Sequence, residues 1–188
     1  DLEIRGAGSL LGEIQHGHLE QVGYDTYCNL LDEVIKEIQG EVVTPEIDVQ
    51  IDLDATCYIP DTYISDSSQK IEMYQEIALC KNEEDIQNVI DEMIDRFGDM
   101  PKEIENLIEI ARIKTLCKKL NISKVQSKKN FVVFIFEPGE INIDINELVK
   151  KYKNRIKFTQ GIKPQIILAL DNVSEIKMLK EVKEFLCI

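Results

Sequence analysis

The residues in the most specific chemical setting stand in the first seventeen positions, where one arginine and one glutamine lie among closely spaced glycines. The guanidinium of Arg5 presents five donors in a fixed geometry that suits phosphate or carboxylate, and Gln15 donates and accepts hydrogen bonds at once. Such glycine density predicts a loop or interrupted helix that needs positive φ or close backbone approach. These glycines are Gly6, Gly8, Gly12 and Gly17. The residues alone leave open whether Arg5 binds an anion or satisfies carbonyl groups at a helix end.

A second candidate site is the polar side of residues 83–97, which have the periodicity of an amphipathic helix. The apolar stripe consists of Ile86, Val89, Ile90, Met93, Ile94 and Phe97. Opposite it, at about 100° per residue, lie Glu84, Asn88, Asp91 and Asp95, with Glu92 beside them. Like charges three and four positions apart cost a few tenths of a kcal/mol per pair, a cost that a basic partner would remove. The alternative is an acidic face that only meets solvent.

A third group is basic and falls within sixteen residues: Lys114, Lys118, Lys119, Lys124, Lys128 and Lys129. Contact with DNA is one interpretation, and ion pairing with the acidic half of the chain is the other. The histidines His16 and His18 have no thiolate partners nearby in a metal-site spacing, so we expect no metal. Five cysteines without a CxxC pair predict free thiols in a reducing compartment, the cytoplasm.

The composition sets limits on these sites. The chain has 188 residues and a net charge of −13, distributed as −19 over residues 1–100 and +6 over residues 101–188. This acidity argues against general nucleic-acid binding, and no apolar run approaches the roughly 18 residues of a membrane span. Neither a phosphate-binding loop nor a recognisable nucleophile or zinc-protease motif is present. An independent small enzyme is therefore the least favoured class.

The elements that must position these residues follow from the apolar periodicity. Helices are predicted over 24–39, from Ser67 or Ser68 to about 80, from an Asn82 cap to Gly98, over 101–120, over 145–153, and from Ser174 onward. Strands are predicted over 49–59, 131–136, 156–158 and 165–170. The pattern indicates an α+β fold with a small mixed sheet, several helices and a helical hairpin extension in front. We expect residues 1–44 and 45–188 to form separate parts.

The opening run resembles the translocation motif found at the end of the motor module in RecG-like DNA helicases and in bacterial transcription-repair coupling factors. Residues 69–120 are similar to the C-terminal domain of the coupling factors, which RecG-like helicases lack. This similarity rests on Tyr74-Gln75-Glu76-Ile77-Ala78, Ile94-Asp95-Arg96-Phe97-Gly98 and Ile110-Ala111-Arg112. Because the chain starts inside a patterned segment without Met, we expect a fragment of a coupling factor, with a fragment of a RecG-like fork helicase as the alternative.

The resemblance implies a parent motor that uses ATP and magnesium to move on double-stranded DNA, displaces stalled RNA polymerase and recruits the repair protein UvrA. Arg5 and Gln15 match the family's positions that couple ATP hydrolysis to DNA movement, and Gly6, Gly8, Gly12 and Gly17 match those that shape the hairpin. For this fragment the sequence predicts neither ATPase activity nor a cofactor.

The resemblance also implies a role for the acidic face. In the family, the C-terminal domain is an autoinhibitory clamp that packs on the N-terminal UvrA-binding module. Glu92 and Asp95 match the acidic positions of that contact, and Asp91 and Asn88 share their helix face. The expected partner is therefore the N-terminal module of the same protein, and no membrane partner is expected.

Overall fold

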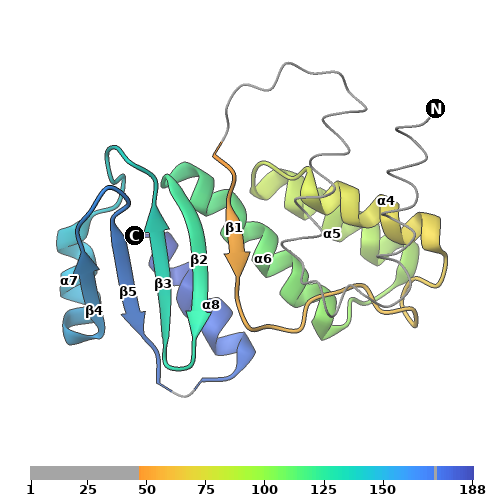
Figure 1. Ribbon diagram of the computed structural model, residues 1–188. Helices are drawn as coiled ribbons and strands as arrows, with labels where there is room; N and C mark the ends of the chain where they lie inside the picture. Colours follow the sequence, from red (N-terminus) through yellow and green to blue (C-terminus); the bar gives the residue numbers. More distant parts are fainter. Residues whose placement is uncertain (1–46, 172) are drawn as a thin grey trace, which may run out of the picture. The chain divides into compact units, whose positions relative to one another are not determined.

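The computed structural model describes residues 47–171 and 173–188, shown as a ribbon in Figure 1. Within them the fold is α+β, as predicted, with five α-helices and a mixed sheet of five strands. The opening run from Arg5 to Gly17, the predicted helix over 24–39, both histidines and Cys28 lie outside the described residues. None of the described helices is long and apolar enough to cross a bilayer.

The chain divides into two compact units, which we describe separately. Unit 1 comprises Asp1–Pro45 and Thr56–Ile108, and unit 2 comprises Glu46–Ala55 and Glu109–Ile188. Helix α6 (Lys102–Lys119) continues from the first unit into the second, with the division after Ile108.

Unit 1 contains α4 (Ser67–Ala78) and α5 (Glu83–Phe97), and each helix begins at a side-chain cap. The predicted cap of α5 is confirmed, because Asn82 Oδ1 accepts from the Asp85 amide at 2.8 Å. The predicted cap of α4 is one or two residues off: Asp66, rather than Ser67 or Ser68, accepts from the Gln69 amide. Helix α5 ends at Gly98, as predicted, with φ of 90°.

The core of unit 1 is formed by one side of each helix. Its buried members include Met73, Tyr74 and Ile77 of α4, Ile86, Val89 and Met93 of α5, and Ile104 and Leu107 of α6. The predicted apolar stripe of α5 is therefore correct at its centre. At its border Ile94 is 44% exposed, because a stripe of six residues is wider than the face that the neighbouring helices cover.

The alternating segment 49–59 forms a strand only over β1 (Gln50–Asp52), so the predicted length was wrong. The alternation does describe burial, since Val49, Ile51 and Ile59 are all buried. Beyond Asp52 the backbone is bonded by side chains instead of a neighbouring strand. Ser127 Oγ accepts from the Asp54 amide at 2.8 Å, and the Tyr74 hydroxyl accepts from the Ile59 amide at 2.7 Å. The period of two in the sequence therefore predicts correctly which side chains are buried. It does not predict that the segment forms hydrogen bonds with a neighbouring strand.

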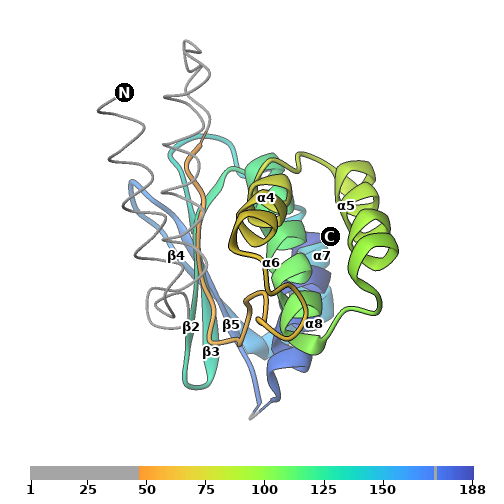
Figure 2. The same cartoon turned by 90° about the vertical axis from the view of Figure 1, so that its right-hand side faces the viewer.

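Unit 2 is built on a sheet with strand order β1-β2-β3-β5-β4. Its other strands are β2 (Ile122–Lys128), β3 (Phe131–Phe136), β4 (Ile156–Thr159) and β5 (Gln165–Ala169). Strand β1 runs parallel to β2, and the remaining neighbours are antiparallel. The helices α7 (Ile145–Tyr152) and α8 (Glu175–Leu186) lie on the same side of this sheet (Figure 2). The ring of Phe134 on β3 stacks on Phe185 of α8 with centroids 4.0 Å apart.

Candidate functional site

The polar side of α5 is exposed at four of the five positions that the sequence singles out. Glu84, Asn88, Asp91 and Asp95 are all exposed. Gln87 Nε2 donates to Asp91 Oδ1 at 2.9 Å, one helical turn along the same face. Asp95 forms no ion pair with any described residue. This face therefore offers carboxylates to solvent, and that of Asp95 is not compensated by a neighbouring cation within the described chain.

The fifth position, Glu92, is half-buried and turned toward α4. Arg96 Nη1 lies 2.9 Å from Glu92 Oε1 and 3.3 Å from Oε1 of Glu72, which belongs to α4. The same guanidinium lies 4.9 Å from the centroid of the Phe97 ring. Arg96 thus connects the two helices through their carboxylates. The acidic face divides into an outward part, Asp91 and Asp95, and an inter-helix part around Glu92.

The inter-helix part includes a further carboxylate, Glu76 of α4. Burial raises the pKa of Glu76 to about 7, helped by its hydrogen bond to Glu92 and by the nearby charges of Glu92 and Glu72. The pKa of Glu92 is lowered, because Glu76 and Arg96 both donate hydrogen bonds to its carboxylate. Of these two carboxyl groups, Glu76 is therefore the one that keeps its proton to higher pH, up to about neutrality. We call Glu72, Glu76, Glu92 and Arg96 the α4–α5 cluster.

Carboxylate oxygens of Glu72, Glu76 and Glu92 lie within 4.8 Å of one another, a spacing that hard cations accept. Arg96 already supplies a positive charge to two of these three carboxylates. The guanidinium and the proton on Glu76 together account for the compact arrangement, and we assign no metal to it.

Sequence reasoning missed the α4–α5 cluster because it depends on the packing of two helices. Two signals in the sequence were available: Glu72 and Glu76 are spaced i,i+4, as are Glu92 and Arg96. Each spacing places two charged groups on one helix face. Neither spacing indicates that the two faces meet.

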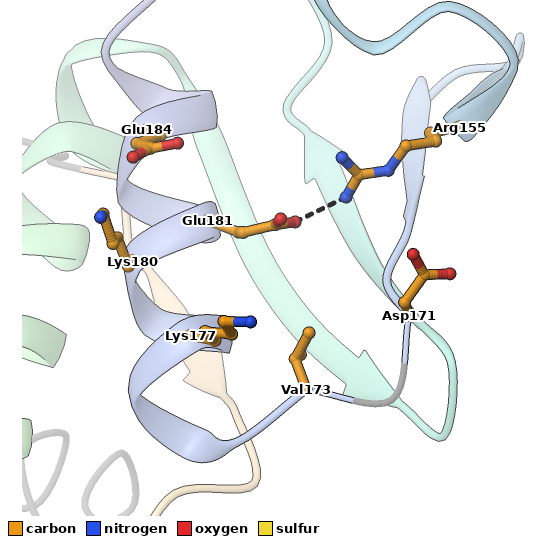
Figure 3. A pocket seen from close by; sticks show the side chains of 7 residues that line it. All are labelled: Arg155, Asp171, Val173, Lys177, Lys180, Glu181 and Glu184. Atoms are coloured by element: carbon orange, nitrogen blue, oxygen red, sulfur yellow. Dashed lines mark hydrogen bonds and ion pairs between the residues drawn. The ribbon is translucent and has the colours of Figure 1, made fainter.

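Unit 2 contains an open pocket of about 310 Å³ beside α8, drawn in Figure 3. It is lined by Arg155, Asp171, Val173, Lys177, Lys180, Glu181 and Glu184. Arg155 Nη2 lies 2.6 Å from Glu181, and the guanidinium also donates to the Ala169 carbonyl oxygen. The three cationic side chains are balanced by three carboxylates. Such a lining gives no selectivity for an anion such as phosphate, and we assign the pocket no ligand.

The basic group of residues 114–129 is not a single exposed patch. Lys114 is only 7% exposed, which removes it from any surface that phosphate groups would contact. Lys124 and Lys128 lie on β2, a strand that the sequence analysis missed. The strand escaped notice because its buried residues, Ile122 and Val125, are three positions apart rather than two, owing to a register irregularity between Ile122 and Lys124.

Comparison with known proteins gives consistent matches. The family model described as the TRCF domain matches residues 53–148. The transcription-repair-coupling factor of Bacillus subtilis is 39% identical over 161 residues, and that of Rickettsia typhi is 38% identical over 160 residues. These alignments cover 83% and 84% of this chain but only 14% of each relative.

A solved structure, described as the C-terminal domain of transcription-repair coupling factor, has the same fold. It superposes with a TM-score of 0.66 at 24% identity, covering 73% of this chain and 89% of that structure. At 24% sequence identity, this similarity shows that the two proteins share a fold. It includes most of the solved domain, whereas the full-length relatives are about seven times longer than the stretch that they share with this chain.

Proposed function

Since this chain belongs to the transcription-repair coupling factor family, we propose that it is the C-terminal part of an ATP-dependent DNA translocase. The parent would displace stalled RNA polymerase in the cytoplasm and recruit UvrA, with ATP and magnesium bound by motor segments elsewhere. Residues 1–44 would be the tail of the motor module, and residues 45–188 a regulatory domain. The matched stretch 53–148 lies in the part that RecG-like helicases lack, which favours the coupling factor over the fork helicase.

Within that parent, the regulatory domain would act as an autoinhibitory clamp on the N-terminal UvrA-binding module. The observation that supports this role is the exposed carboxylate of Asp95, which no described cation neutralises, one turn from exposed Asp91. A basic surface that docks here gains charge complementarity, which accelerates association and fixes the orientation of the two partners. Release of the clamp would expose the module to UvrA.

Glu92 would contribute to this contact in a different way from Asp95. Its carboxylate is bonded to Arg96 at 2.9 Å and accepts a hydrogen bond from Glu76. A cation of the partner would have to share Glu92 with Arg96. We therefore assign the direct contact to Asp91, Asp95 and Asn88, and to Glu92 a role in holding α5 against α4 while adding negative charge to the surface.

The test is a binding measurement between this chain and the isolated N-terminal module of its parent. The double substitution Asp91→Lys with Asp95→Lys should weaken the affinity by roughly tenfold or more at low salt. The matched control is Glu140→Lys with Glu147→Lys, which makes the same charge change at two exposed carboxylates of unit 2. Equal affinities of the two double variants would refute the docking role of α5.

The opening run needs a test in the full-length parent. Arg5→Ala should leave ATP binding intact and abolish displacement of RNA polymerase, because Arg5 would transmit hydrolysis to movement rather than bind nucleotide. The remaining positions of the motif, Gln15 and the glycines Gly6, Gly8, Gly12 and Gly17, belong to the same proposal. If the parent with Arg5→Ala displaces RNA polymerase normally, the proposed coupling role of the opening run is refuted. The clamp proposal is not affected by that result.

A further inference from the structure

The outer strand of the unit 2 sheet has one edge without a partner strand among the described residues. Strand β4 pairs with β5 in antiparallel register and occupies the end of the strand order. Its other edge presents backbone N–H and C=O groups that an additional strand can bond. Helix α7 precedes β4 in the chain and contacts it, so the edge lies beside a helix (Figure 1).

Exposed apolar side chains are concentrated in the segment of the chain that contains this strand. Ile145 and Val149 of α7 are 42% and 45% exposed, and Phe158 of β4 is 43% exposed. Ile162, in the turn between β4 and β5, is 86% exposed. Four of the seven large apolar side chains that are exposed in the described chain thus fall within residues 145–162. Such a concentration is typical of a surface that is covered in a complex.

The register of the sheet shows on which side Phe158 lies. Phe158 is opposite Ile166, which is opposite Phe134, the residue that stacks on Phe185 of α8. Cross-strand partners share a face, so Phe158 lies on the helix-covered side of the sheet, at its rim. Lys157, the preceding residue, lies on the opposite side. A strand added to β4 would therefore have apolar surface on one side and a cation on the other.

The segment around β4 itself carries an excess of positive charge. Residues 145–163 contain six basic side chains and one acidic side chain, Glu147. Lys150, Arg155 and Lys163 have ion-pair partners at Glu147, Glu181 and Glu137. Lys153 and Lys157 are exposed and pair with no described carboxylate. The surface around β4 therefore complements a negatively charged partner.

We propose that the free edge of β4, together with the neighbouring side of α7, binds an extended acidic segment of a partner protein with apolar residues at alternate positions. Its backbone would pair with β4, alternate side chains would cover Phe158, and its carboxylates would face Lys153 and Lys157. Charge argues against a second copy of this chain as occupant, because two β4 edges side by side would bring like charges together. The site lies in unit 2 and is independent of the α5 contact.

A short edge strand with a lysine is also a common protection against unwanted pairing. Protection of the edge against pairing does not explain the exposed apolar side chains of Ile162 and Phe158. Such side chains would increase the tendency of the protein to associate with other chains. Their presence beside a lysine edge instead fits a selective surface. The cations disfavour pairing with a basic edge and favour pairing with an acidic strand.

The experiment is an NMR titration of the full ¹⁵N-labelled chain with a short synthetic peptide of alternating glutamate and valine. Amide shifts should change in β4 and α7, and binding should weaken as salt is added. Phe158→Ser should reduce the affinity roughly tenfold, and so should Lys153→Glu with Lys157→Glu. The control is Ile94→Ser, which removes an apolar side chain of nearly equal exposure from unit 1, 44% against 43% for Phe158.

Four results would overturn the proposal. If a lysine–valine peptide binds as well as the glutamate–valine peptide, the proposed preference for an acidic partner is refuted. An absence of shift changes in β4, or equal affinities of the Phe158→Ser and Ile94→Ser variants, would remove the site. Sedimentation equilibrium that shows a dimer abolished by Phe158→Ser would assign the edge to a second copy.

Discussion

Replacement of Glu76 by glutamine tests the α4–α5 cluster, because glutamine retains a donor toward Glu92 but carries no charge at any pH. In the native protein Glu76 is half-buried among Glu72 and Glu92, and its pKa is raised to about 7. The folded state therefore retains a proton that the unfolded chain releases at a lower pH. This difference links the free energy of unfolding to pH.

The sign follows from the raised pKa. The contribution of Glu76 to stability is fully present below its ordinary pKa of 4.5 and is lost as the pH rises through about 7. Without solvent screening, a shift of this size corresponds to about 3 kcal/mol. Since Glu76 is partly exposed, screening reduces the expected effect to about 1 kcal/mol. The Glu76→Gln variant should therefore be more stable than the native chain at pH 8.5, and its advantage should shrink by pH 5.5.

Urea unfolding followed by circular dichroism at the two pH values measures this difference directly. Glu140→Gln, a substitution at an exposed loop carboxylate, is the control and should show no comparable pH dependence. If the advantage of Glu76→Gln is the same at pH 5.5 and pH 8.5, the proton does not reside on Glu76 and the electrostatic account of the cluster fails.

Four further predictions concern stability. Tyr74→Phe should lower the free energy of unfolding by about 1–3 kcal/mol in urea, because it removes the acceptor of the buried Ile59 amide, and should speed hydrogen exchange there. Tyr152→Phe should be neutral or stabilising in the same assay, since its buried hydroxyl has no hydrogen-bond partner in the described chain; a comparable loss would contradict this. Gly98→Ala should cost about 1–2 kcal/mol through its φ of 90° alone, because no atom lies within 4 Å of the added Cβ. Asn82→Ala should cost about 1 kcal/mol by removing the cap of α5, visible as reduced thermal stability.

Local signals predicted α5 well because they act within one helix. The cap at Asn82 and the stop at Gly98 each depend on residues adjacent in sequence, and both are observed. The central stripe is also correct, since periodicity directly reports which side is buried. The exposure of Ile94 was not predictable, because the width of the covered face is set by the neighbouring helices.

Tertiary contacts explain what the sequence could not predict. Segment 49–59 alternates as a strand does, yet the Tyr74 hydroxyl and Ser127 Oγ take backbone bonds that a neighbouring strand would otherwise make. Strand β2 has an irregular register, so its burial lacks a period of two. In the candidate site, the exposure of Asp95 followed from helix geometry. The half-burial of Glu92 required Glu72 and Glu76 of another helix.

The opposite charges of the chain's two halves lead to one further expectation, that their surfaces take different kinds of partner. The acidic side of α5 offers only side chains, because the backbone groups of a helix are bonded internally, so its partner has to bind it through basic side chains. The edge of β4 offers backbone groups, so its partner must be an extended segment. Asp91→Lys with Asp95→Lys should therefore leave glutamate–valine peptide binding unchanged. Lys153→Glu with Lys157→Glu should leave binding of the N-terminal module unchanged. If either pair of substitutions alters both affinities to the same extent, net charge controls association, and neither surface has a partner of its own.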